Sequence, residues 1–150
     1  MSVVAVCPVE VIGSCPAGIT TTDEFEIADM ALLNPAGHRV CFMAVAQLPI
    51  GQGVWQLQSG ERFFSHVSCP GCSSDPEREN RVVFLLSHAD KRELSHAISE
   101  YLRLWRRHVE PDTARRLKEE AIHFQSRGDY TAAARHMASA VEQMRRLTGP

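Results

Sequence analysis

The sequence predicts an α+β protein: a small mixed or antiparallel sheet with a short buried helix, followed by a C-terminal three-helix segment that ends in a helical hairpin. Up to about residue 88, apolar residues gather in short runs rich in β-branched types, whereas after Asp90 they recur with the helical period. We therefore expect a cysteine-containing α+β domain over residues 1–88 and a helical extension over residues 89–150. A chain of 150 residues with 44% hydrophobic content can bury an ordinary core.

The first strand is predicted over residues 3–12, a Val-rich run that closes at Gly13. Pro8 lies inside this run and has no backbone N–H, so we expect the strand to lie at an edge of the sheet. Residues 40–48 are predicted as a short buried helix, with a buried strand as the alternative.

Further strands and turns follow from alternation and from turn residues. Turns are predicted at the two Pro-Ala-Gly sequences, residues 15–18 and 34–37. Strands are predicted at residues 23–27, at 54–58 and 62–67 as a hairpin around Ser59-Gly60, and at 82–86.

The helical segment carries its own start and stop signals. Asp90 and Glu93 have the spacing of a capping box, which predicts a helix over about residues 90–108. A hairpin is predicted over about residues 112–147, with Gly128 and Asp129 as the C-cap and N-cap where its two helices meet. A stripe of Met137, Val141 and Met144 could form internal core or an interface with a partner.

The charge is unevenly distributed along the chain. Residues 1–90 carry four arginines against ten acidic residues, and residues 91–150 carry twelve Lys and Arg against eight acidic residues. In the basic half, arginines and acids stand at helical spacing, as in Arg115/Glu119, so a solvated helix face is favoured and no nucleic-acid partner is expected.

The N-terminal apolar run lacks a basic leader and is interrupted by Pro8 and Glu10. We therefore expect neither a signal peptide nor a membrane span, and predict a cytoplasmic protein. Five cysteines is an odd number, and in the cytoplasm thiols stay reduced, so a disulfide scaffold is disfavoured.

The strongest local motif is Cys69-Pro-Gly-Cys72, which follows a predicted strand and precedes a polar loop. Two thiolates at this spacing can chelate one ion across a tight turn, as in a zinc knuckle. A redox Cys-x-x-Cys instead usually opens a helix, so metal binding is favoured over dithiol chemistry.

A structural zinc site normally has four ligands. The predicted metal site is Cys15, Cys41, Cys69 and Cys72, with zinc as the favoured ion and iron or copper as alternatives. His38 and His66 are further candidates, and buried packing is the alternative for Cys41 and Cys7, both of which have apolar neighbours.

The sequence has no Gly-rich phosphate loop, nucleophile elbow or dinucleotide fingerprint, so nucleotide use and serine-hydrolase chemistry have no support. Asp23, Glu24 and Glu26 are candidate acids beside a metal, although charges on a strand face need no catalytic role.

Several of these motifs also occur together in known proteins. The sequence over about residues 3–86 resembles a family of small, largely uncharacterised bacterial and archaeal proteins that carry a Cys-Pro-Ala-Gly turn, a Gly-Asp-Glu-Phe strand, an Ile-Cys-Pro helix start and a late Cys-Pro-Asp. The corresponding parts here are residues 15–18, 23–27, 40–41, 69–70 and 80–84. The resemblance implies that Cys15, Cys41 and Cys69 belong to one site and names no activity.

The chain departs from the family pattern at three places. Thr22 stands where the family has Gly, Phe42 where it has Pro, and Gly71-Cys72 where it has Asp. Cys72 would then be an added fourth ligand or a bystander. Outside the resemblance, the C-terminal hairpin is weakly similar to one tetratricopeptide-type repeat, which needs neighbours to bury its faces.

Three hypotheses follow. The first is a metal-binding protein with a cysteine-thiolate site of structural or catalytic role. The second is a metal-free thiol enzyme, for redox or sulfur transfer, that uses Cys15, Cys41 and Cys69. The third is a protein-interaction module that binds a partner or forms a homodimer through residues 111–150.

Overall fold

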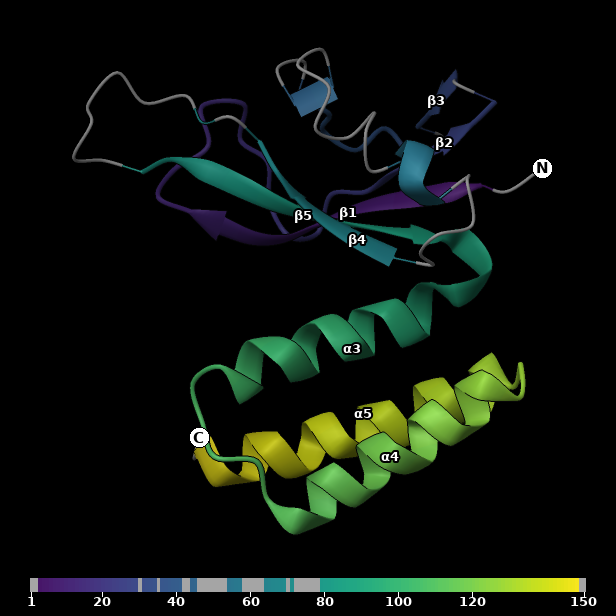
Figure 1. Cartoon of the computed structure of the whole chain (residues 1–150). Coiled ribbons are helices and arrows are strands. Elements are labelled where there is room, and N and C mark those ends of the chain that lie inside the picture. Colours follow the sequence, from purple (N-terminus) through teal and green to yellow (C-terminus); the bar gives the residue numbers. More distant parts are fainter. Residues whose placement is uncertain are drawn as a thin grey trace. The chain divides into compact units, whose positions relative to one another are not determined.

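The computed structural model describes residues 3–29, 31–34, 36–41, 44–45, 54–57, 64–69, 71 and 79–148. The chain divides into two compact units, Met1–Asp90 and Lys91–Pro150. The first contains an antiparallel sheet and the second contains long helices (Figure 1), which confirms the predicted α+β class with a C-terminal helical segment.

Five strands form the sheet of the first unit, and neighbouring strands are all antiparallel. Their order across the sheet is β3-β2-β1-β5-β4. The strands are β1 (Val4–Ile12), β2 (Phe25–Ala28), β3 (Ala31–Leu33), β4 (Phe64–Ser68) and β5 (Arg81–His88).

The first strand is central, so its predicted place at an edge is wrong. Pro8 is tolerated because β2 pairs with β1 only from Val4 to Val6, so in the described part of the chain no strand pairs with Pro8 on that side. Towards β5, the register shifts between Pro8 and Glu10, and such irregular positions are among those where a sheet accommodates proline.

The core of the first unit lies on one face of this sheet. Alternate residues of the two central strands, among them Val6 and Phe84, join buried residues from the connecting segments. The buried cluster is Val4, Val6, Ile19, Phe25, Cys41, Ala44, Val54, Leu57, Val82, Phe84 and Leu86. Cys7 is also buried, but it follows Val6 in β1 and so points to the opposite face.

Two predictions concern the segments between β3 and β4. Ala44 and Val45 are helical, and the N–H of Val45 donates to the Cys41 carbonyl at 3.3 Å, which is the four-residue spacing of an α-helical hydrogen bond. Of the predicted helix over residues 40–48, positions 42–43 and 46–48 lie outside the described residues.

The β-hairpin predicted at residues 54–58 and 62–67 is wrong in its first strand, since residues 54–57 are helical. Val54 and Leu57 are buried while Trp55 is 72% exposed, a spacing of three that places two apolar side chains on one helical face. The second half is confirmed as β4, and the turn at Ser59-Gly60 lies outside the described residues.

The second unit consists of α3 (Arg92–Trp105), α4 (Asp112–Ser126) and α5 (Tyr130–Thr148), with α5 packed against both other helices. Asp129 caps α5 as predicted, since its Oδ1 accepts the Ala132 N–H at 3.0 Å. The predicted capping box is not formed: a 3₁₀ turn (Ala89–Lys91) precedes α3, and no side chain caps its first turn.

The stripe of Met137, Val141 and Met144 is buried within this unit and therefore forms core. A polar group also joins α3 to α4: the Glu110 carboxylate accepts hydrogen bonds from the Tyr101 hydroxyl and the Lys118 ammonium. None of the helices in the described part of the chain has the length and apolarity to cross a membrane.

Candidate cysteine site

Cys15 begins a tight turn after the first strand. The Gly18 N–H donates to the Cys15 carbonyl at 2.9 Å, and Gly18 has φ +70°, a conformation that glycine adopts without strain. The predicted Cys-Pro-Ala-Gly turn is therefore formed, and it fixes the backbone that carries the Cys15 thiol.

Cys41 lies three residues before the helical residue Ala44, and both belong to the buried cluster of the first unit. Cys41 is 8% exposed, and Cys15 and Cys69 are also packed against this cluster. Cys41 therefore packs in the core, as the alternative for this residue predicted, and this holds whether or not its sulfur also has a chemical role.

Cys69 extends the pairing of β4 with β5 by one residue. Its N–H donates to the Val82 carbonyl at 2.9 Å, and the Val82 N–H donates to the Cys69 sulfur at 3.1 Å. This second bond orients the sulfur from a strand rather than from a loop.

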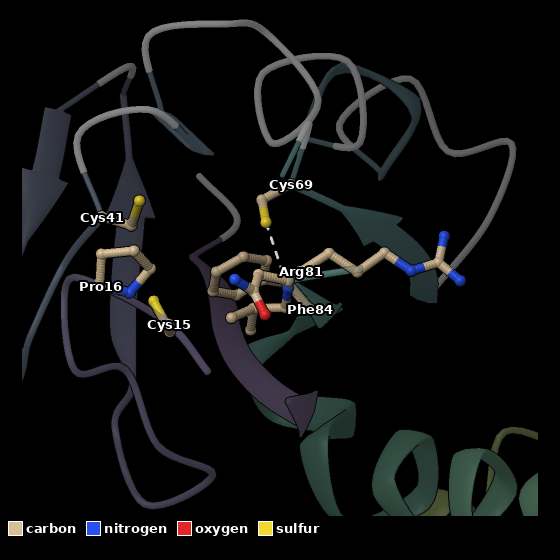
Figure 2. Close-up of a pocket in the computed structure, with 8 residues that line it drawn as sticks. Cys15, Pro16, Cys41, Cys69, Arg81 and Phe84 are labelled. Atoms are coloured by element: carbon tan, nitrogen blue, oxygen red, sulfur yellow. Dashed lines mark hydrogen bonds between the residues drawn. The ribbon is translucent and has the colours of Figure 1, made fainter. Parts of the chain in front are cut away.

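The three cysteines line one small pocket in the first unit. In Figure 2, Cys15, Pro16 and Cys41 lie on one side, and Cys69 and Phe84 on the other. The cavity volume is about 10 Å³, near the smallest space that holds one water molecule. A single atom or small ion fits a space of this size, whereas an organic cofactor does not.

The walls of the pocket carry little charge. Its other lining residues include Val82, Asn80 and Arg81. The Arg81 guanidinium points away from the three sulfurs, and its Nε pairs with Glu79 at 2.8 Å. Sulfur is therefore the dominant ligand type that the pocket offers.

In the described part of the chain, no three His, Cys, Asp or Glu side chains are grouped closely enough to hold a metal ion. Cys72, the predicted fourth ligand, lies outside the described residues. His38 and His66 are not among the residues that line the pocket, and Cys7 is buried in β1 away from it.

The acidic candidates do not line the pocket either. The Asp23 carboxylate instead binds backbone N–H groups, with Oδ2 accepting from Thr20 at 2.8 Å and Oδ1 from Arg39 at 3.0 Å. The hydrogen bond from Thr20, together with that from Arg39, holds the pKa of Asp23 below its ordinary value, although burial opposes this. Glu24 lies directly before β2 and Glu26 lies within it, and both are partly buried.

Sequence reasoning missed two residues that shape the surroundings of the pocket. The Arg39 guanidinium donates to the Ala17 carbonyl at 3.1 Å, inside the turn that begins at Cys15. Asn80 accepts the Ser14 N–H through Oδ1 at 3.1 Å. Gly13, with φ +70°, gives room for Asn80, since a Cβ there would lie 2.1 Å from the Asn80 Oδ1. The glycines at positions 13 and 18 were the available sequence signal, because they indicate turns with positive φ. They do not indicate that Asn80 and Arg39 are the side chains that approach these turns.

Comparisons of the chain with protein-family models, with curated proteins and with solved structures found no match. The family resemblance over residues 3–86 stays a prediction.

Proposed function

We propose that the pocket of Cys15, Cys41 and Cys69 binds one thiophilic metal ion, zinc being favoured and copper(I) or iron being alternatives. The observation that supports this is the meeting of three cysteines, far apart in sequence, on a cavity of single-atom size. Thiolate ligands select zinc, copper(I) and iron–sulfur centres over hard cations such as magnesium.

Charge explains why a metal suits this pocket. Three thiolates in an apolar cavity would be costly without a cation, whereas neutral cysteine side chains pack as small apolar groups. A metal ion compensates the thiolates and displaces their protons, which makes its binding stronger as the pH rises. The Val82 N–H, which donates to the Cys69 sulfur, would support that sulfur as a thiolate ligand.

Binding requires the pocket sulfurs to come closer together, and since the Cys69 sulfur is held by the Val82 N–H, we assign this movement to Cys15 and Cys41. Rotation about the first side-chain torsion moves a cysteine sulfur between staggered positions without moving the backbone. Cys72 is the proposed fourth ligand because it follows Cys69 at the spacing of a zinc knuckle. A closed site of four thiolates serves structure, and a site with an open position could activate water.

The second candidate is a metal-free thiol site for redox or sulfur transfer. It rests on the same meeting of Cys15, Cys41 and Cys69 on one pocket, which would bring a reactive thiol and a resolving thiol together. It requires one thiol that reacts as a thiolate near neutral pH and a second that resolves the product by forming a disulfide.

The test is elemental analysis by mass spectrometry of tag-free protein purified without chelator. We expect near-stoichiometric metal in the wild type and its loss in Cys15→Ser, Cys41→Ser, Cys69→Ser and Cys72→Ser. Cys7→Ala is the matched control, because Cys7 is 4% exposed yet does not line the pocket, and it should retain the metal.

Absence of metal, even after anaerobic reconstitution with zinc, iron or copper(I), would reject the metal proposal. In that event, a disulfide between two pocket cysteines that forms and reduces reversibly would support the thiol candidate. Failure to form one would leave the three cysteines as core packing alone.

A further inference from the structure

Among the described residues, no sheet pairing joins the segment that carries Cys15 to the segment that carries Cys41. Cys15 lies in the connection between β1 and β2, and Cys41 lies in the connection between β3 and β4. Neither cysteine lies in a strand, so the distance between their sulfurs depends on contacts between two loops.

One buried carboxylate joins these loops. Asp23 is 9% exposed, and its Oδ2 accepts the Thr20 N–H at 2.8 Å while its own N–H donates back to the Thr20 carbonyl at 3.1 Å. This closes the end of the loop that begins at Cys15. The Oδ1 accepts the N–H of Arg39, two residues before Cys41, at 3.0 Å.

The same junction is completed from the other side. The Arg39 side chain reaches back to the Ala17 carbonyl, so Arg39 contacts the Cys15 loop through both its backbone and its guanidinium. The His38 Nδ1 lies 3.8 Å from the Asp23 Oδ1 and adds a favourable charge when it is protonated. An ionised carboxylate only accepts hydrogen bonds, which matches the donors that surround Asp23.

We propose that Asp23 is the positioning residue of the cysteine pocket: it fixes the Cys41 segment against the Cys15 loop and so keeps both thiols on one cavity. We call the hydrogen bonds from Thr20 and Arg39 to the Asp23 carboxylate the clamp. The inference deepens the proposed function and rests on it for the role of the pocket, but the clamp itself is tested without any metal. It also assigns Asp23 a role other than the catalytic one that its acidity suggested.

Asp23→Asn is the sharpest variant. An amide has one oxygen and one NH₂ group, so Asn can accept from Thr20 or from Arg39 but presents donors to the other N–H. One bond of the clamp is then lost with almost no change in volume. Asp29→Asn is the matched control, because Asp29 is exposed and its φ of 53° suits Asn.

The measurement is the rate at which a thiol reagent labels each cysteine in the folded, metal-free protein, resolved by peptide mass spectrometry. Cys7 is the internal reference, because it is buried in the central strand β1 but does not line the pocket, so loosening of the two loops alone should affect its labelling rate little. We expect the reagent to label Cys41 about tenfold faster in Asp23→Asn than in the wild type. A factor of this size, about tenfold, corresponds to the loss of one hydrogen bond to a charged group. The rate at Cys7 should change much less, and Asp29→Asn should change neither.

Two outcomes would overturn the proposal. If Cys41 is labelled at the wild-type rate in Asp23→Asn, the carboxylate does not hold the segment. If Cys7 and Cys41 accelerate equally, Asp23 supports the whole unit and not the pocket. Faster labelling of Cys41 alone, in a protein that fails to bind metal, would retain the clamp and reject the metal, so the two failures are distinguishable.

Discussion

Gly18 gives the most direct test of the contact between the Cys15 turn and the Arg39 side chain. Its φ is +70°, and a Cβ built there would lie 2.1 Å from the Arg39 Nη1, closer than such atoms approach. Gly18→Ala therefore has two costs: strain in the left-handed conformation and displacement of the guanidinium from the Ala17 carbonyl.

The two costs can be separated with Gly37, whose φ is +66° and whose Cβ position has no neighbour within 4 Å. Gly37→Ala has only the strain, about 1 kcal/mol after the smaller entropy of its unfolded chain is included. Gly18→Ala should add the lost hydrogen bond, for a total of about 2 kcal/mol.

The assay is native-state hydrogen exchange of the β1 and β5 amides, which measures the free energy of opening the first unit. A double-mutant cycle with Arg39→Ala completes the design: without the guanidinium, Gly18→Ala should cost the same as Gly37→Ala. A cost of Gly18→Ala that stays near 2 kcal/mol in the Arg39→Ala background would refute the argument, because the side chain would then not be the obstacle.

Further predictions concern the helical unit. Glu110→Gln should destabilise it by about 2 kcal/mol in urea unfolding, because Lys118 and Tyr101 lose a largely buried carboxylate; an unchanged midpoint would contradict this. Burial alone would raise the pKa of Glu110, but hydrogen bonds from Lys118 and Tyr101 bring it below its ordinary value of 4.5. Its stabilisation is therefore present above about pH 4.5 and is lost as the pH falls below that value, so in an acid titration by circular dichroism the wild type should lose more stability than Glu110→Gln, in which Glu100 still titrates. Asp129→Ala should cost about 1 kcal/mol through loss of the α5 cap, whereas Asp129→Ser, which keeps an acceptor, should cost less in the same assay.

The sequence predicted elements wherever a local pattern was strong. The Val-rich first strand, the strand β5 and the helical hairpin with its Asp129 cap are present. Local patterns failed where distant partners decide. Pro8 excludes a central position only if the neighbouring strands pair with β1 along its whole length. Here the pairing of β2 with β1 ends at Val6, before Pro8.

The segment at residues 54–57 failed for a related reason. Val54 and Trp55 favour a strand by propensity, but burial of Val54 with Leu57 in the core selects a helical turn. The Asp90/Glu93 spacing was equally ambiguous, since a 3₁₀ turn takes the place of the first helical turn. In each case four or five residues carry too little information to outweigh tertiary packing.

For the candidate site, the sequence indicated which cysteines take part but not which side chains hold their loops in place. Cysteine chemistry and motif order pointed to Cys15, Cys41 and Cys69, which line one pocket. The contacts of Asp23 with Arg39 and of Asn80 with Ser14 join residues far apart in the chain. No pattern in a single sequence pairs such residues, because a side chain that binds a distant backbone N–H leaves no periodic trace.

The site and the core share the same atoms, and this decides how substitutions should be read. Cys41 belongs to the buried cluster, so Cys41→Ser places a hydroxyl among Val and Phe side chains and lowers stability even if no metal is ever bound. Cys41→Ala removes the sulfur without adding a polar group, and it loses packing instead. The two variants should therefore differ in stability but agree in metal content if the sulfur is a ligand. Metal content that follows stability rather than the presence of the sulfur would indicate that unfolding, not ligand loss, explains the effect.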